Sequence, residues 1–213
     1  MTVQTWLIWL VAYLLGSVPS AYIASQLVLG RDIRELGDGN MGAKNAFHSV
    51  GWLAGVLVAS ADSAKGALAV GLACRLQAHD GVVLVAGVCA VLGHDFPVFA
   101  RFRGGQGMAT IVGVFGMLFP LQTALALCAL ALGLILSHNW DLSCAVAFVL
   151  LVGLIWTVGE PPRRLLYPFF VLPTIAMRKV MQKWRAHHTM LEHSLGNTLG
   201  GNGNGVRHEK NGS

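Results

Sequence analysis

The sequence predicts an all-α integral membrane protein that crosses the bilayer with about seven helices. The 213 residues are 54% hydrophobic and only 12% charged, and the mean hydropathy is +0.60. A soluble domain carries about twice that charged fraction. Long apolar segments also recur along the chain, each close to the ~20 residues that cross the hydrocarbon core of a bilayer.

Seven apolar segments are candidate membrane spans. They cover residues 4–28, 51–76, 80–99, 106–120, 121–137, 142–159 and 165–182. No basic region precedes the first segment, so we expect it to stay as a helix rather than to be removed as a signal peptide. Only Pro120 separates the fourth segment from the fifth, which predicts a tight helical hairpin or one broken element.

Loop charges predict the orientation of these spans. Nine basic residues fall on one side of the predicted membrane: Arg31, Arg34, Lys44, Arg101, Arg103, Arg178, Lys179, Lys183 and Arg185. Three fall on the other: Arg75, Arg163 and Arg164. Since cytoplasmic loops carry the excess of Lys and Arg, we expect the N-terminus outside and the C-terminus in the cytoplasm.

The composition changes abruptly after the last apolar segment. Residues 186–213 are rich in Gly and Asn and poor in hydrophobic residues. Such a segment cannot bury enough apolar surface to fold. We therefore expect one membrane domain over residues 1–185, followed by a disordered polar tail.

The loop over residues 34–48 contains glycines and amide side chains at short intervals. They are Gly37, Gly39, Asn40, Gly42 and Asn45. Short turns at these positions can point backbone amides into one concavity, which suits an anion or a polar head group. An ordinary polar turn between two helices explains the same residues.

A second polar stretch, residues 93–110, lies between two apolar segments. It contains Arg101, Arg103, Gly104, Gly105, Gly107 and Thr110, and an apolar helix is predicted directly after the glycines. Backbone amides and the positive end of a helix dipole would then lie beside guanidinium groups, as in a phosphate site. The alternative is that the arginines are membrane anchors and the glycines form a plain turn.

Further ionisable residues lie within or beside the spans. Asp62 and Lys65 are three positions apart at the centre of the second span. Charges at that depth pair with each other, either as a structural lock or as a ligand contact. His94 ends the third span and can act as a general base, donate a hydrogen bond, or order the loop.

Several classes of function find no support in the sequence. The four cysteines (Cys74, Cys89, Cys128 and Cys144) are scattered in apolar segments without metal-ligand spacing, so we expect small core residues and no metal or other cofactor. No nucleophile elbow or P-loop is present. The net charge of +5 belongs mostly to the loops, so no nucleic-acid partner is expected.

Four runs of the sequence resemble a known family. They are LGSVPSAY (15–22), IRELGDGNMGAKNAF (33–47), ADSAKG (61–66) and GHDFPVFARFRGGQGMAT (93–110). These runs are similar to the bacterial acyl-phosphate:glycerol-3-phosphate acyltransferases, the PlsY family. The resemblance implies a seven-helix protein of the bacterial inner membrane whose active site faces the cytoplasm. Such proteins move a fatty acyl group from acyl-phosphate to the 1-position of glycerol 3-phosphate, giving lysophosphatidic acid without coenzyme A or a metal.

The resemblance also assigns roles to residues. It implies that Gly104, Gly105 and Gly107 belong to a phosphate-binding loop, and that Asn40, Gly42 and Asn45 belong to a catalytic loop. Together with the patterns above, it leads us to expect Asn40, Asn45, Lys65 and His94 as catalytic residues. We expect substrate or phosphate binding by Gly42, Arg101, Arg103, Gly104, Gly105, Gly107 and Thr110.

The chain departs from the family pattern at several positions. Asp38 and Asp141 stand where serines are usual, Lys44 for threonine, His48 for arginine and Gln106 for lysine. Asp38 adds negative charge and Gln106 removes positive charge, which disfavours a dianionic phosphate, whereas Lys44 and His48 add positive charge to the same loop. Two alternatives therefore stay open: a relative that acylates a less anionic acceptor, and an impaired membrane-binding pseudoenzyme or transporter.

Overall fold

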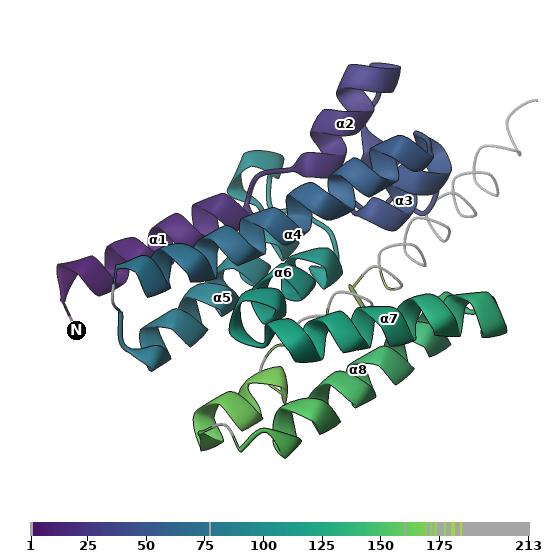
Figure 1. Cartoon of the computed structure of the whole chain (residues 1–213). Coiled ribbons are helices and arrows are strands. Elements are labelled where there is room, and N and C mark those ends of the chain that lie inside the picture. Colours follow the sequence, from purple (N-terminus) through teal and green to yellow (C-terminus); the bar gives the residue numbers. More distant parts are fainter. Residues whose placement is uncertain are drawn as a thin grey trace, which may run out of the picture.

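The computed structural model describes residues 2–76, 78–159 and 161–169, and the single positions 171, 173, 177, 180, 181 and 184. Every regular element in these ranges is a helix (Figure 1). The elements are α1 (Val3–Gly16), α2 (Ser20–Leu29), η1 (Ile33–Glu35), α3 (Ala43–Ser49), α4 (Trp52–Arg75), α5 (Asp80–Asp95), η2 (Val98–Ala100), α6 (Met108–Leu118), α7 (Pro120–Ser137) and α8 (Trp140–Thr157). The all-α prediction is therefore confirmed.

Five helical stretches are long and apolar enough to cross a membrane: Val3–Leu29, Trp52–Arg75, Asp80–Ala100, Pro120–Ser137 and Trp140–Thr157. The predicted fourth span corresponds to the shorter apolar helix Met108–Leu118. Eight of the eighteen residues of the predicted seventh span (170, 172, 174–176, 178, 179 and 182) and the whole of the predicted tail lie outside the described residues.

The first predicted span is interrupted. α1 ends at Gly16 and α2 begins at Ser20, after Pro19. Proline has no backbone N–H and its ring clashes with the preceding helical turn, so a helix is broken there. The Ser17 hydroxyl donates to the carbonyl of Tyr13 at 2.8 Å and completes the end of α1.

Glycines bring α4 and α6 into close contact. A side chain at Gly66 would collide with the carbonyl oxygen of Thr110, and one at Gly113 would collide with that of Ser63. The Ser63 hydroxyl also donates to the carbonyl of Ala109 at 2.9 Å. This contact places the middle of α4 beside the first turn of α6.

The sequence break at Pro120 is present in the structure. α6 ends at Leu118, and Pro120 occupies the first turn of α7, where its missing N–H removes no hydrogen bond. α7 and α8 then form an antiparallel pair below the other helices in Figure 1, joined by a short turn. In that turn His138 is left-handed (φ 50°), and the Asn139 side chain accepts from the Leu142 amide at 3.0 Å.

Candidate active site

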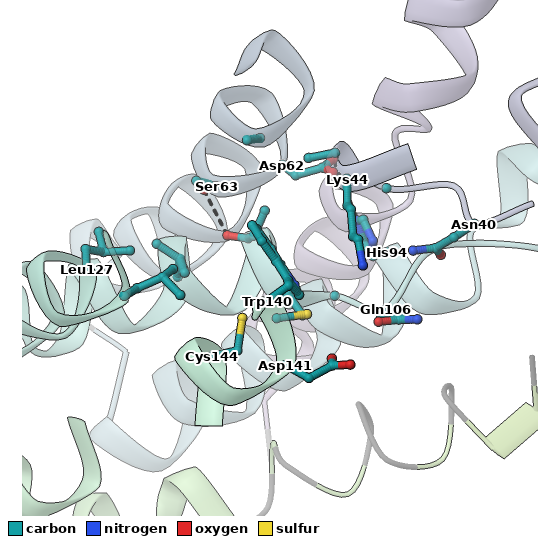
Figure 2. Close-up of a pocket in the computed structure, with 18 of the residues that line it drawn as sticks. Asn40, Lys44, Asp62, Ser63, His94, Gln106, Leu127, Trp140, Asp141 and Cys144 are labelled. Carbon is teal, nitrogen blue, oxygen red and sulfur yellow. Dashed lines mark hydrogen bonds and ion pairs between the residues drawn. The ribbon is translucent and has the colours of Figure 1, made fainter. Parts of the chain in front are cut away.

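A pocket of about 500 Å³ opens at the end of the bundle where the two polar loops and the α7–α8 turn meet. Its polar lining residues are Asp38, Asn40, Lys44, Asp62, Ser63, His94, Gln106 and Asp141 (Figure 2). Met108, Val112, Leu127 and Leu130 form an apolar part of the same wall. The structure therefore brings the two predicted loops into a single site.

Asn45 holds the first loop together from the inside. Its side-chain amide donates to the carbonyls of Ile33 (3.2 Å), Leu36 (2.9 Å) and Asn40 (3.0 Å). Its own oxygen accepts from the Ser49 hydroxyl at 2.9 Å. Asn45 is 2% exposed and is not among the described lining residues, so the structure gives this expected catalytic residue a scaffolding position.

Asn40, Gly42 and Asp38 form the part of this loop that faces the pocket. The backbone amide of Asn40 donates to the Asp38 carboxylate at 3.0 Å, which closes an Asx-type turn. Gly42 precedes the first residue of α3. Asp38 therefore orders the loop as well as adding negative charge to the pocket.

The second loop packs closely against the first loop at Gly105. A side chain at Gly105 would collide with Nε2 of His94 and would lie 2.7 Å from the carbonyl oxygen of Met41. Gly107 is left-handed (φ 69°) and precedes α6. Gly107 lines the pocket, whereas Gly104 and Gly105 are buried beside it.

Arg34 links the two loops. Its guanidinium group pairs with Asp32 and donates through Nη1 to the carbonyl of Ala100 at 3.1 Å. The guanidinium beside Asp32 lowers the pKa of that carboxyl from its ordinary value of 3.8. From the sequence, Arg34 was counted only among the basic residues that predict the orientation of the spans. Nothing in the sequence indicated that Ala100 would lie close to it.

The two arginines expected to bind phosphate are not in the pocket lining. Arg101 and Arg103 are exposed and do not line the pocket. Arg101 and Phe102 are both left-handed (φ 55° and 59°) and form the turn that leads back towards the glycines. Thr110 is fully buried in α6 and is likewise absent from the lining.

Asp62, Lys65 and His94 form a buried charged cluster on the inner wall. The Lys65 ammonium lies 2.9 Å from Oδ1 of Asp62, and Nδ1 of His94 lies 3.7 Å from the same oxygen. Lys65 also donates to the carbonyl of Val18 at 3.0 Å, at the break between α1 and α2. The predicted ion pair is therefore present, with Asp62 and His94 facing the pocket and Lys65 behind them.

Trp140 and Ser63 line the pocket although the sequence did not single them out. Trp140 is the first residue of α8, and its ring centroid lies 5.9 Å from the Lys44 ammonium. Asp141, the next residue of α8, also lines the pocket. Within the part of the chain that the structure describes, no group of three His, Cys, Asp or Glu side chains could hold a metal ion.

Comparisons with known proteins agree with this arrangement. The sequence profile of the family described as "Glycerol-3-phosphate acyltransferase" matches residues 6–192. "Glycerol-3-phosphate acyltransferase 4" of Dehalococcoides mccartyi is 44% identical over 147 residues, which cover 69% of this chain and 77% of that protein. The glycerol-3-phosphate acyltransferase of Chlorobaculum parvum is 34% identical over 199 residues, which cover 87% and 81%.

The fold is also that of a solved relative. The crystal structure of PlsY (YgiH), an integral membrane glycerol 3-phosphate acyltransferase, in its glycerol 3-phosphate form superposes with a TM-score of 0.78 and 27% identity. That match covers 87% of this chain and 93% of the PlsY chain. The chain therefore belongs to the glycerol-3-phosphate acyltransferase family, the PlsY family of integral membrane proteins.

Proposed function

We propose that this protein transfers a fatty acyl group from acyl-phosphate to glycerol 3-phosphate, giving lysophosphatidic acid and inorganic phosphate for phospholipid synthesis. The observation that carries the proposal is the convergence of both polar loops and the start of α6 on one pocket. The family membership supports the same acceptor, since the related PlsY structures are described with glycerol 3-phosphate and with lysophosphatidic acid.

The start of α6 suits an anion. Gly107, the residue before the helix, has no side chain that could cap the first turn, and Gly107, Met108 and Ala109 all line the pocket. The first amides of a helix have no partner within the helix, and the helix dipole adds positive potential there. A phosphate group at this end would satisfy both.

An acyl chain suits the apolar wall. A second pocket of about 100 Å³ lies between α6, α7 and α8, and its lining is almost entirely apolar. It shares Met108, Val112, Leu127, Leu130 and Cys144 with the polar pocket. An amphipathic donor would place its phosphate near the loops and its acyl chain among these side chains.

Because acyl-phosphate is already activated, the protein mainly has to align the two substrates. The acceptor hydroxyl oxygen attacks the acyl carbonyl carbon, the bond from that carbon to the phosphate oxygen breaks, and the departing phosphate takes the hydroxyl proton. Holding two reactants in line and stabilising developing charge can supply most of such an acceleration. In this proposal Asn40 and His94 contact the reactants, while Asn45 and Lys65 keep the loop and Asp62 in place.

The proposed setting is the bacterial inner membrane, with the pocket facing the cytoplasm. The excess of basic residues in the loops at the pocket end of the molecule supports this orientation. Activated acyl donors are made on that side.

The test is turnover by purified protein in lipid supplied with acyl-phosphate, with and without glycerol 3-phosphate. We expect lysophosphatidic acid only when glycerol 3-phosphate is present. Asn40→Ala should lose most of this activity, whereas Glu35→Gln, an exposed change in the same loop, should keep it. Absence of product from the unaltered protein would refute the proposal and favour a ligand-binding or transport role.

A less anionic acceptor is the second candidate, because the carboxylates of Asp38 and Asp141 both line the pocket. Carboxylates accept hydrogen bonds from hydroxyl groups but repel phosphate. A screen of polyols and phosphorylated polyols with acyl-phosphate separates the two functions. Glycerol 3-phosphate as the clear best acceptor would remove the second.

A further inference from the structure

Lys44 is the single Lys or Arg side chain, among those that the structure describes, that lines the active-site pocket. Lys65 lies behind the wall and is bound to Asp62 and to the carbonyl of Val18. Arg34 is bound to Asp32 and Ala100. Lys65 and Arg34 therefore already have partners, and the other described arginines of the two loops, Arg101 and Arg103, lie on the exposed surface.

Lys44 contacts an aromatic ring and no described carboxylate. Its ammonium lies 5.9 Å from the ring centroid of Trp140, within the range of a cation–π contact. No described carboxylate forms an ion pair with it within 4.0 Å. Figure 2 shows the side chain pointing into the pocket, on the side of Asn40 and Gln106. An aromatic ring can orient an ammonium in this way while leaving it able to donate hydrogen bonds to an anion.

The charges of the lining explain why such a group is needed. Asp38, Asp62 and Asp141 bring carboxylates to the pocket, and the charge of Asp62 is matched by Lys65. Gln106, at the start of the helix that faces the pocket, is neutral. Lys44 is therefore the one described lining ammonium that can offset part of this negative charge by contacting a dianionic head group.

We propose that Lys44, held over Trp140, binds the phosphate group of the acceptor in this protein and sets its preference for a phosphorylated alcohol. This inference rests on the proposed function, because it takes glycerol 3-phosphate as the acceptor. Lys44 is the group that touches the phosphate, and Trp140 is a positioning residue that acts through Lys44.

The test measures KM for each substrate separately. Lys44→Met should raise KM for glycerol 3-phosphate roughly tenfold to hundredfold, as expected for one lost charge-assisted hydrogen bond. It should leave KM for acyl-phosphate and the melting temperature nearly unchanged, because Lys44 is exposed. Lys44→Arg, which keeps the charge, should stay close to the unaltered protein. Arg31→Met removes an exposed positive charge outside the pocket and serves as the matched control.

A second pair of variants tests the position of the charge and the role of the ring. Gln106→Lys added to Lys44→Met should lower KM for glycerol 3-phosphate again, because position 106 lines the same pocket. Trp140→Leu should raise that KM while Trp140→Phe, which keeps an aromatic face, raises it less. A purely structural Trp140 would instead change stability and both KM values together.

The outcomes distinguish a failure of this inference from a failure of the proposed function. No turnover of glycerol 3-phosphate by the unaltered protein refutes the proposed function itself. Normal turnover by Lys44→Met with an unchanged KM for glycerol 3-phosphate refutes the role of Lys44 but not the proposed function. A rise in KM for acyl-phosphate instead would assign Lys44 to the donor and also overturn the proposal.

Discussion

The ammonium of Lys65 donates to the carbonyl of Val18, 3.0 Å away, and so joins the middle of α4 to the break between α1 and α2. The same ammonium is the ion-pair partner of Asp62 at 2.9 Å. One buried side chain therefore satisfies a carbonyl exposed by the helix break and the carboxylate that lines the pocket. Without it Asp62 would lose its ion-pair partner, and the Val18 carbonyl would keep only the hydrogen bond from the Ser20 amide at 3.1 Å.

Lys65→Met should strongly destabilise the protein. Removing one partner of a buried ion pair leaves the other charge uncompensated, which costs about 3–5 kcal/mol. The double variant Asp62→Asn/Lys65→Met should recover much of the loss, because no buried charge remains. Thermal unfolding in detergent measures both. Equal stability of Lys65→Met and the unaltered protein would contradict the pairing.

Asn45→Ala should lower stability and activity together. It removes the donor to three loop carbonyls, and each hydrogen bond lost in this way contributes about 0.5–1.5 kcal/mol to stability. Asn40→Ala, on the pocket side of the loop, should instead reduce activity at a nearly unchanged melting temperature. If Asn45→Ala melts normally yet is inactive, Asn45 contacts a substrate and is not a scaffold.

Gly105→Ala should impair both folding and turnover, because the added carbon would collide with the ring of His94. Gly81→Ala is the matched control, since no atom lies within 4 Å of the added carbon there. That change should be neutral or slightly stabilising, because alanine favours a helix more than glycine does. Melting temperature and kcat for each variant check the contrast. A fully active Gly105→Ala would mean that the second loop can move away from His94.

The Asp32–Arg34 contact should make stability depend on pH in the acidic range. The pKa of Asp32 is lowered in the folded protein, chiefly by the side-chain hydrogen bond from Arg34. A carboxyl with a lowered folded pKa stabilises the protein fully above its unfolded pKa, and this contribution is lost as the pH falls through the folded value. The difference in melting temperature between the unaltered protein and Asp32→Asn should therefore be present at neutral pH and shrink as the pH falls below the ordinary pKa of the carboxyl, 3.8. A difference that persists in acid would assign the effect to something other than this charge.

Asp38→Ser combined with Gln106→Lys should increase the catalytic efficiency with glycerol 3-phosphate. The pair removes one negative charge from the pocket lining and adds one positive charge. A serine hydroxyl can still accept from the Asn40 amide, so the loop turn should survive. Measured kcat/KM values that stay unchanged would show that these two positions do not limit phosphate binding.

The parts of the structure that depend on hydrophobicity were predictable from the sequence. Apolar runs of sufficient length identified the spans, and Pro120 identified the break between α6 and α7. The first predicted span is present as Val3–Leu29, and within it Pro19 lies at the break between α1 and α2. The loop charges predicted that both polar loops lie on the same side of the membrane, since they follow the first and third predicted spans.

Side-chain contacts between distant segments were beyond the sequence. Lys44 and Trp140 meet because the α7–α8 turn returns to the loops, and hydropathy does not fix that packing. The positions of Arg101 and Arg103 depend on the left-handed backbone conformations of Arg101 and Phe102. The residue types at these two positions do not predict such conformations. The roles expected for these two arginines and for Thr110 stay predictions.

The three carbonyls gathered by Asn45 also bear on how the pocket meets its ligand. A flexible loop loses about 1–2 kcal/mol of backbone entropy per residue when it becomes ordered. In this protein that entropy is lost during folding, because the amide of Asn45 orders the loop before any substrate binds. Acceptor binding should accordingly show a small heat-capacity change, with little of the compensation between enthalpy and entropy that marks coupled folding and binding.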